Sequence, residues 1–516
     1  MARQYYERLS AQDHTFLVME DSTIHMHVLG VQIFDAGPLK TAAGGINIDL
    51  YKKGIESVLH LVPRYRQRLG WTPVGNWPVW VDDPDFNIDY HVRHTALPRP
   101  GSEEQLKALT ARISGQQLDR ARPLWEWWVV EGLQGERFAT ITKIHHCMLD
   151  GMSGMDLAQT LFTTTPEYEI QEPRHFVPHA PPSGWEMLRD SLVRRVRLPL
   201  DIIRGVRSFR RETDDLKGEL LTRARAIGDM IGYTAVPAQE TPLNGPVGPH
   251  RRLDWLEMPL AHFKVLSRAF ECTVNDVVLA TVAGAVREFM LARRVHPEDI
   301  NFRVSAPVSV RRPEEQGRMG NRVSSWIVEL PIGEASPRKR LEAIKKATKD
   351  LKTSQQALGV EMMMAVMEWT PTMLMSLGMR ASGSATHMIV TNVPGPQQPL
   401  YLFGARLLAS YPAAPLLPNT GLSLALISLA GKVYWGFNAD YELVPDVHNF
   451  VKMTDHAFAE LADAAGIDLA AAPREIAARE VIPLRSRNGG RVARRKHTAE
   501  IPVVRAAGQR VRAKAE

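Results

Sequence analysis

The stretch KIHHCMLDGMSG, residues 143–154, holds the side chains of this sequence that are best suited to chemistry. Two adjacent imidazoles, His145 and His146, stand shortly before the pair Asp150 and Gly151. A neutral imidazole is well matched to proton transfer near neutral pH, so one of the two could accept a proton from a substrate hydroxyl. Its neighbour would then pack inward, because successive side chains on a strand point to opposite faces. Gly151 would leave room for a tight turn near the reacting atoms.

The residue types alone leave other interpretations of this stretch open. Two adjacent buried histidines can simply be satisfied by backbone hydrogen bonds, and Asp150 is a suitable N-cap for a helix that begins at Gly151. A zinc site is disfavoured, since the two rings point apart and the chain has neither an HExxH nor a paired CxxC motif, and we expect no metal. Cys147 is disfavoured as a nucleophile, because a base for its thiol would have to lie beside it in space.

The composition is that of an ordinary globular protein. Of 516 residues, 44% are hydrophobic and 23% charged, which allows two or three domains with substantial cores. The two cysteines, Cys147 and Cys272, cannot form a disulfide framework and favour a reducing compartment. The N-terminus has no signal-peptide pattern, and the most apolar runs, 277–286 and 421–431, fall short of the roughly 20 residues of a membrane span. We therefore expect a cytoplasmic protein with no transmembrane segment.

The net charge of +6 does not indicate a nucleic-acid partner, because of where the charge lies. From Arg485 to the end of the chain, ten lysines and arginines accompany two glutamates, which gives these residues a net charge of +8. The rest of the chain is therefore −2, close to neutral. The basic character belongs to a Gly/Arg/Ala-rich tail that we expect to be disordered, and we expect no nucleic-acid binding.

The elements around the histidine motif place it at the end of a strand. Residues 25–34 have the pattern of a strand, and residues 49–70 and 103–118 that of helices. Two strand-like runs joined by a short turn then follow, at residues 125–133 and 137–146. The two histidines come where the second of these runs ends.

Proline- and glycine-rich passages divide the chain. Residues 166–185 and 235–252 are dense in such residues, and a basic amphipathic stretch lies between them. Strand-like and helix-like segments alternate on both sides, which predicts an α/β (mixed α+β) fold of two domains with mixed sheets. We expect an N-terminal domain with the histidine motif over residues 1–165 and a linker with a basic helix over 166–250. A C-terminal domain over 251–484 and a basic tail over 485–516 follow.

HHCMLDG, residues 145–151, matches the HHxxxDG signature of the CoA-dependent acyltransferase superfamily, which includes chloramphenicol acetyltransferase, plant alcohol acyltransferases and the condensation domains of peptide synthetases. The chain as a whole resembles one branch, the bacterial wax ester synthase/acyl-CoA:diacylglycerol acyltransferase family, from about residue 8 to 465. The stretches that carry this resemblance, in order, are LSAQDHTFLVMEDSTIHMHVLGVQIF (9–34), RPLWEWWVVEGL (122–133), LNGPVGPHRR (243–252), TVNDVVLA (273–280), SAPVSVR (305–311), GNRVSSWIVELP (320–331) and TNVPGP (391–396).

The resemblance implies two chloramphenicol-acetyltransferase-like domains, each a mixed β-sheet flanked by helices, with the active-site channel between them. It also implies transfer of a long-chain fatty acyl group from acyl-CoA to the hydroxyl of a diacylglycerol or a long-chain alcohol, giving triacylglycerol or wax ester. Acyl-CoA is a substrate in this reaction, and no cofactor is implied. Because acceptor and product are nearly insoluble in water, peripheral contact with the inner membrane face or with lipid droplets is also expected.

By the same resemblance, His146 is the general base and His145 supports it. The acceptor hydroxyl adds directly to the thioester carbonyl, with no acyl-enzyme intermediate. Asp150 is structural, and its carboxylate pairs with an arginine for which Arg303 and Arg311 are both candidates.

Two further family motifs have matches in this chain. Asn275 and Asp276 match an Asn-Asp pair that supports the active-site geometry, although Thr273 and Asp276 also have the spacing of a capping box. The second match is a motif linked to acceptor binding, which consists here of Pro123, Leu124 and Trp125. Trp125 is equally well explained as a core residue at the start of a strand.

Two other functions remain open at this stage. One is a condensation-type or polyketide-associated acyltransferase that uses carrier-protein thioesters, which gives no reason for the NVPGP and PLW stretches. The other is a catalytically silent lipid-binding protein with the same fold, which the intact histidine motif disfavours. The choice of acceptor, the acyl chain length and the oligomeric state are not encoded in any pattern of the sequence.

Overall fold

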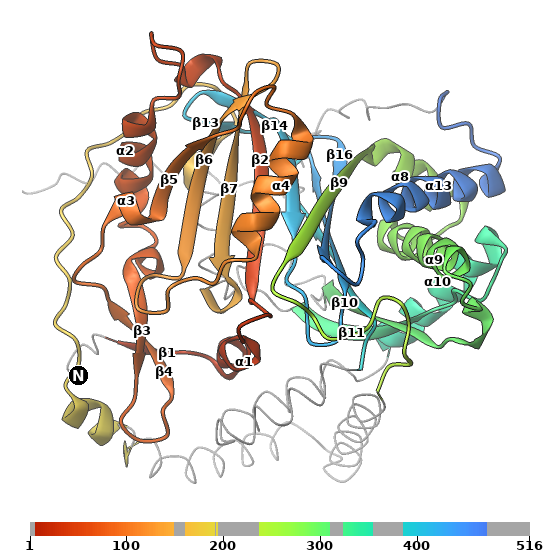
Figure 1. Ribbon diagram of the computed structural model, residues 1–516, viewed down its shortest axis with the longest axis horizontal. Helices are drawn as coiled ribbons and strands as arrows, with labels where there is room; N and C mark the ends of the chain where they lie inside the picture. The colour runs from red at the N-terminus through yellow and green to blue at the C-terminus, as the bar shows by residue number, and fades with distance from the viewer. Residues whose placement is uncertain are drawn as a thin grey trace, which may run out of the picture. The chain divides into compact units, whose positions relative to one another are not determined.

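The structure, a computed structural model, contains two large mixed β-sheets flanked by helices (Figure 1) and a small three-stranded sheet. The predicted fold class, a mixed α/β protein with two flanked sheets, is confirmed. The parts of the chain that the structure describes are residues 6–148, 160–190, 192–193, 237–309, 323–353 and 385–471.

The first large sheet has seven strands in the order β5-β6-β7-β2-β14-β13-β8. Among them only β5 and β6 run parallel, and every other neighbouring pair is antiparallel. The strands are β2 (His27–Asp35), β5 (Val92–Ala96), β6 (Trp125–Leu133), β7 (Arg137–His145), β8 (Phe162–Thr163), β13 (Tyr401–Leu402) and β14 (Ala405–Ala413).

Alternating side chains give this sheet two apolar faces. Phe138 of β7 joins a core cluster that includes residues of helix α2 (Ile48–Val58), whereas Ile141 joins one that includes helix α4 (Glu103–Ser114). Each helix thus covers a different face. The remaining N-terminal elements are β1 (Glu7–Arg8), α1 (Ala11–Met19), η1 (Gly37–Leu39), η2 (Pro63–Arg66), β3 (Gln67–Trp71), β4 (Pro78–Asp82), α3 (Ile88–His91) and η3 (His146–Met148), of which β1, β4 and β3 form the small sheet.

The helix predicted over residues 49–70 is wrong in its second half, because α2 ends at Val58. Pro63 cannot continue a helix, since it has no backbone N–H to donate. The residues after it enter the small sheet instead, where Arg68 lies opposite Val81 of β4. The amphipathic pattern of the first half does not extend past that proline.

The second large sheet has six strands in the order β11-β10-β12-β15-β16-β9. One face carries Trp435 and Phe437, which pack with the long buried helix α9 in the largest core cluster. Its elements are β9 (Arg251–Pro259), α8 (Leu260–Ala269), α9 (Val274–Ala292), η4 (Pro297–Asp299), β10 (Phe302–Ser309), β11 (Val323–Leu330), α10 (Pro337–Thr353), β12 (Met388–Pro394), β15 (Leu422–Leu429), β16 (Lys432–Asp440) and α13 (Val447–Ala465).

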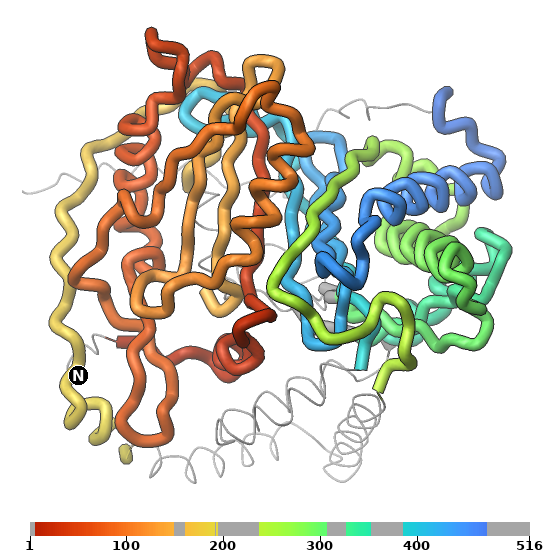
Figure 2. The backbone as a smooth tube through the Cα atoms, viewed as in Figure 1, coloured from red at the N-terminus to blue at the C-terminus, as the bar shows by residue number. Residues whose placement is uncertain are grey.

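Strand β14 joins the two sheets. It comes late in the chain, between strands of the second sheet, yet it pairs with β2 in the first, as the blue tube beside the red one shows in Figure 2. Side chains of the second sheet also donate hydrogen bonds to β14 and to the residue after it: the Tyr434 hydroxyl donates to Leu408 O over 3.1 Å, and the Asn438 amide donates to Ala414 O over 2.8 Å. The ring of Tyr411 stacks on Trp255 of β9 with centroids 4.9 Å apart. The first sheet is therefore completed by residues far from it in sequence.

The domain divisions predicted at residues 165, 250 and 484 stay a prediction. The tail over 485–516 and most of the basic linker lie outside the described residues. Among the helices that the structure describes, none alone is long and apolar enough to span a membrane; α8 and α9 meet that criterion only when taken together, and they are bent by 97°.

Gly436 of β16 lies close against the backbone of β14. A Cβ at this position would overlap the carbonyl of Pro412 on β14, so Gly436→Ala must push the two sheets apart. We expect the unfolding free energy to fall by about 1–3 kcal/mol, seen as a lower thermal midpoint. Gly37→Ala is the control, because a Cβ there would meet only Asp35 Oδ1 at 3.5 Å. Equal midpoints for the two variants would contradict the close-contact account.

Candidate active site

The two motif histidines lie where the strand β7 ends and the turn η3 begins, with His145 last in the strand and His146 first in the turn. The adjoining backbone holds both residues: the N–H of His145 donates to Leu124 O over 3.0 Å, and that of His146 donates to Met26 O over 2.7 Å. The predicted position of the pair at a strand end is confirmed. Two separate segments of chain therefore fix the backbone that carries the imidazoles.

The two imidazoles have different surroundings. His145 is fully buried, its Nδ1 accepts a hydrogen bond from the backbone N–H of Cys147 over 3.2 Å, and its Nε2 lies 3.4 Å from Oε2 of Glu20. His146 keeps part of its surface accessible. Its ring stacks on that of Phe16, with 3.9 Å between the centroids and 29° between the planes. One ring is thus tied into a polar network, and the other lies against an aromatic face.

His146 is in the uncharged form that can accept a proton. Burial lowers its pKa to about 4, the electrostatic influence of His145 lowers it further, and a backbone hydrogen bond acts in the opposite direction. A histidine whose pKa lies well below 7 is neutral at physiological pH. The imidazole is therefore available as a general base without first losing a proton.

Glu20, which directly follows helix α1, is the acidic partner of two buried histidines. Its side chain is only 1% exposed, with Oε1 3.4 Å from Nε2 of His27 and Oε2 3.4 Å from Nε2 of His145. Arg120 donates to Oε2 through Nε over 3.0 Å and also through Nη2. Burial raises the pKa of the Glu20 carboxyl, but the hydrogen bonds from His145 and His27 outweigh it, and the net shift is downward. The carboxylate is thus charged, and Arg120 balances it.

A small apolar cluster lies next to this network and draws on both halves of the molecule. Met26, whose carbonyl holds the His146 backbone, belongs to it, and so does Phe16, whose ring covers His146. The buried members are Ile24, Met26, Val247 and Leu416, with Phe16, Met19 and Leu417 packed against them. The described residues beside the His146 ring are therefore apolar.

Cys147 does not have the properties of a nucleophile. Its side chain is buried, and burial raises the pKa of the thiol well above the usual value, with the charges of Asp13 and Glu20 adding to the effect. The thiol lies 3.0 Å from Nδ1 of His145, so it is close to an imidazole after all. A thiol that stays protonated is a poor nucleophile, and this contact is structural.

Pro123, Leu124 and Trp125 lie at the start of β6, and the last two are fully buried. Trp125 donates Nε1–H to Tyr65 O over 2.8 Å and stacks on His91 at 4.5 Å. The carbonyl of Leu124 is the one that holds the His145 N–H. These contacts tie the segment to the histidine motif through the backbone, while its predicted role in acceptor binding stays a prediction.

Asp276 has the contacts of a helix cap. Its carboxylate accepts the backbone N–H and the hydroxyl of Thr273 over 2.8 and 2.7 Å, which completes a capping box at the start of α9. It also accepts the hydroxyl of Thr348 of α10 over 2.7 Å, which joins two helices. The capping spacing noted in the sequence is confirmed. Support of the active-site geometry by Asn275, which is half-buried in the first turn, and by Asp276 stays a prediction.

Asp150, Gly151 and Arg311 lie outside the described residues, so the pairing of Asp150 with an arginine stays a prediction. The other candidate, Arg303, is buried on β10 and donates Nη2–H to Pro237 O over 2.8 Å. Its backbone N–H donates to Nδ1 of His387 over 3.0 Å.

Sequence reasoning missed four residues that surround the two imidazoles: Phe16, Glu20, His27 and Arg120. Arg120 is 100 residues from Glu20, so no local spacing connects them. One usable signal was the alternation of His25 and His27, which places two imidazoles on the same face of a strand.

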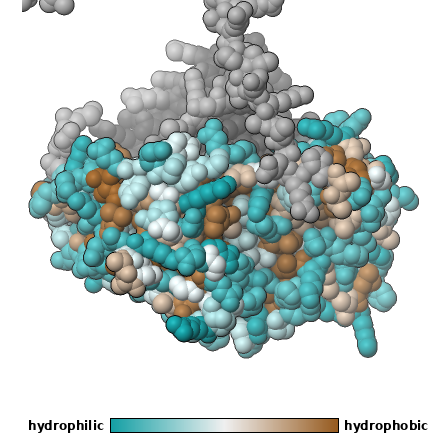
Figure 3. Space-filling model, turned by 90° about the horizontal axis from the view of Figure 1, so that it is seen from above, coloured by the Kyte–Doolittle hydropathy of each residue, from teal (hydrophilic) through white to brown (hydrophobic). Residues whose placement is uncertain are grey.

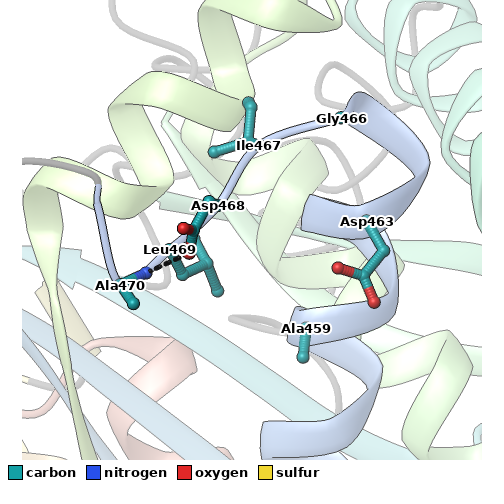
Figure 4. A pocket seen from close by; sticks show the side chains of 7 residues that line it. All are labelled: Ala459, Asp463, Gly466, Ile467, Asp468, Leu469 and Ala470. Atoms are coloured by element: carbon teal, nitrogen blue, oxygen red, sulfur yellow. Dashed lines mark hydrogen bonds between the residues drawn. The ribbon is translucent and has the colours of Figure 1, made fainter.

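Other features of the described chain do not compete as reaction sites. Within the described ranges, no three His, Cys, Asp or Glu side chains are grouped as a metal ion would require. A hollow of about 430 Å³ opens at the end of α13 (Figure 4), and it shares no residue with the histidine pair. Its lining consists of Ala459, Asp463, Gly466, Ile467, Asp468, Leu469 and Ala470.

Two family models match the chain. The wax ester synthase/diacylglycerol acyltransferase catalytic domain matches residues 9–278, and the C-terminal domain of the same family matches residues 319–462. A protein of Mycobacterium tuberculosis named "probable diacylglycerol O-acyltransferase tgs1" is 31% identical over 463 residues, which cover 88% of this chain and 95% of that protein. The family resemblance that the motifs indicated is confirmed.

Solved structures share the fold. A wax ester synthase/diacylglycerol acyltransferase from Marinobacter aquaeolei VT8 superposes with a TM-score of 0.62 at 23% identity, over 89% of this chain and all of the other. The starter condensation domain of rhizomide synthetase, solved with C8-CoA and Leu-SNAC, superposes with a TM-score of 0.55 at 13% identity, over 89% of this chain and 95% of that domain. The two-domain fold common to these enzymes is therefore the fold of this protein.

Proposed function

We propose that this chain, which belongs to the wax ester synthase/diacylglycerol acyltransferase family, transfers a long-chain fatty acyl group from acyl-CoA to the hydroxyl of diacylglycerol, a long-chain alcohol or both. The observation that carries this proposal is His146: an uncharged imidazole at a strand end, lying against Phe16 in apolar surroundings. Such a group can take a proton from an alcohol, and its apolar surroundings suit a lipid better than a polar acceptor.

The reaction proceeds by direct attack in a ternary complex. The acceptor hydroxyl gives its proton to His146 as its oxygen forms a bond to the thioester carbonyl carbon. The tetrahedral oxyanion then collapses, the carbon–sulfur bond breaks, and His146 returns the proton to the departing CoA thiolate. Nδ1 of His146 is buried, so Nε2 is the ring nitrogen that meets the hydroxyl. Holding both substrates together removes much of the entropic barrier.

The identity of the acceptor hydroxyl is a separate part of the proposal. The relative tgs1 is named as a diacylglycerol O-acyltransferase, which favours diacylglycerol, whereas the family name also includes wax ester synthesis. The condensation-type alternative would use a carrier-protein thioester in place of acyl-CoA, and a lipid-binding protein with the same fold would release no CoA.

The proposed function predicts thiol release from palmitoyl-CoA that depends on an acceptor and on His146. We expect release with diacylglycerol or hexadecanol and little without an acceptor. His146→Ala should lower kcat by about 10²–10⁴-fold, because it removes the general base. His456→Ala is the matched control, since this histidine is exposed and pairs with Glu288 on the surface of the second half.

The outcomes of this assay separate the alternatives. Activity only with a phosphopantetheinyl carrier would replace the proposal with the condensation-type reaction, and no release with any donor would replace it with lipid binding. If His146→Ala keeps nearly full turnover at an unchanged melting temperature, the assignment of the base is wrong.

We further propose that the protein contacts a lipid surface through exposed apolar side chains on two adjacent elements. The face of the molecule in Figure 3 is mainly hydrophilic, with small, separate hydrophobic groups. By contrast, Trp185 is 72% exposed and Trp71 40% exposed. A Cβ added at Gly184 would lie 3.7 Å from Pro73, so the two elements touch. We call these side chains the hairpin–helix patch: Trp71 and Val74 belong to the hairpin of β3 and β4, and Trp185, Leu192 and Val193 are helical residues.

Tryptophans on such a patch would enter the interface between lipid headgroups and acyl chains, where their amphipathic rings are favoured. We expect Trp71→Ala/Trp185→Ala to reduce several-fold the fraction of protein that floats with vesicles of phosphatidylcholine, phosphatidylglycerol and diacylglycerol. The control is Leu291→Ala/Tyr441→Ala, which removes exposed apolar side chains from the other half. Equal flotation of both double variants would rule out this patch as the lipid contact.

A further inference from the structure

We propose that Glu20 is a positioning residue for the acyl transfer: it holds His145 in one tautomer and, through His145, the turn that presents His146. This inference rests on the proposed function, since it gives Glu20 a role in the reaction assigned to His146. The side-chain contacts of Glu20 are with His27, His145 and Arg120, not with the proposed base. Glu20 acts through a chain of contacts that starts at the end of α1 and ends at η3.

The first step is the Glu20 carboxylate, which is buried and lies between two histidines. Its two oxygens face different histidines, with His27 opposite Oε1 and His145 opposite Oε2, each at 3.4 Å. Arg120 binds Oε2 and also donates Nη2–H to Leu17 O over 3.0 Å, which ties the end of α1 to the same guanidinium. A charge with so many partners has little freedom to move.

The second step is the tautomer of His145. The backbone N–H of Cys147 donates to Nδ1, so Nδ1 carries no proton when the ring is neutral. The proton is therefore on Nε2, and this is the nitrogen that faces Glu20. A carboxylate 3.4 Å from Nε2 favours that tautomer electrostatically, because the other tautomer would direct a lone pair at the negative charge.

The third step leads from His145 to the base. Cys147 follows His146 directly in η3, so the bond from its N–H to His145 Nδ1 anchors the turn on which His146 lies. If His145 changed its tautomer, Nδ1 would become a donor and would face the Cys147 N–H, another donor. The turn would then lose this bond, and His146 would lose its fixed position.

Helix α1 adds a second contact that depends on the same anchor. Phe16, one turn before Glu20, supplies the ring on which His146 stacks. One helix thus positions both imidazoles, one through a carboxylate and the other through an aromatic face. Loss of the Glu20 charge would leave only the Leu17 carbonyl to hold the end of α1 to Arg120, and both contacts would be weakened.

A second buried carboxylate nearby supplies a matched control. Glu126 of β6 pairs with Lys143 of β7 and so lies on the same face of the sheet as His145. Its side chain is 7% exposed, almost as buried as that of Glu20. It pairs with Arg93 at 3.2 Å and with the buried Lys143 at 3.7 Å, and it accepts Nε1–H of Trp128. It contacts neither motif histidine, so its loss should cost stability without moving His146.

The test compares the isosteric variants Glu20→Gln and Glu126→Gln, with Glu20→Asp as the rescue. We expect Glu20→Gln to lower kcat by about 10- to 100-fold while the KM for palmitoyl-CoA changes little, because substrate binding is untouched. Glu20→Asp keeps the charge and should recover part of kcat. Glu126→Gln should keep nearly the full kcat even where its melting temperature falls as much as that of Glu20→Gln.

Modification by diethyl pyrocarbonate, located by peptide mass spectrometry, gives a readout that needs no turnover. Both ring nitrogens of His145 have contacts, so we expect it to be protected in the wild type and in Glu126→Gln but modified in Glu20→Gln. Full kcat and a protected His145 in Glu20→Gln would overturn the proposal, as would equal losses of kcat in the two Gln variants. An inactive wild type would overturn the proposed function alone, since the modification pattern would still test the role of Glu20.

Discussion

A base that accepts a proton from an alcohol at neutral pH must be uncharged beforehand. Burial meets that condition at His146, the residue that we propose as the base. In this apolar environment Nδ1 of the His146 ring has no hydrogen-bond partner within the described parts of the chain. Orientation must then come from packing and from the backbone. The Phe16 ring and the carbonyl of Met26 provide both, and each comes from the N-terminal segment that leads into β2.

The same requirement explains why the neighbouring polar groups are concentrated on His145. A buried carboxylate, a guanidinium and two imidazoles lie together on one side of the motif, whereas the described neighbours of His146 are apolar. The division works because adjacent residues at a strand end can face different environments. The fold adds the second half of the surroundings, since β14 crosses to the first sheet and Leu416, which follows it, packs near Met26.

Much of this arrangement was predictable from the sequence, and the part that was not has a common cause. The strand that carries the histidines and the capping box at Asp276 follow from local spacing. The expectation that Cys147 is no nucleophile holds for another reason than the sequence suggested: an imidazole does lie beside its thiol, and burial keeps the thiol protonated. The positions of Phe16, Glu20 and Arg120 do not follow from local spacing, because single residues of these types are common in or beside a short helix and in a turn, and only the fold brings them to the motif. The exchange of β14 between sheets escaped notice for the same reason: an alternating strand does not specify which sheet it joins. The helix predicted over residues 49–70 is too long for a different reason, since Pro63 is a local signal that a helix ends before it.

The central claim, that burial keeps His146 neutral and ready as the base, is tested most directly by the pH dependence of kcat/KM for palmitoyl-CoA with a saturating acceptor. A lowered pKa means that the base stays unprotonated as the pH falls, so we predict nearly constant kcat/KM from pH 7 to about 5.5 and an acid limb close to the value of about 4 for His146, measured where the protein stays folded. An ordinary histidine with a pKa of about 6.5 would retain only about a tenth of its activity at pH 5.5. An acid limb centred near 6.5 would contradict the account.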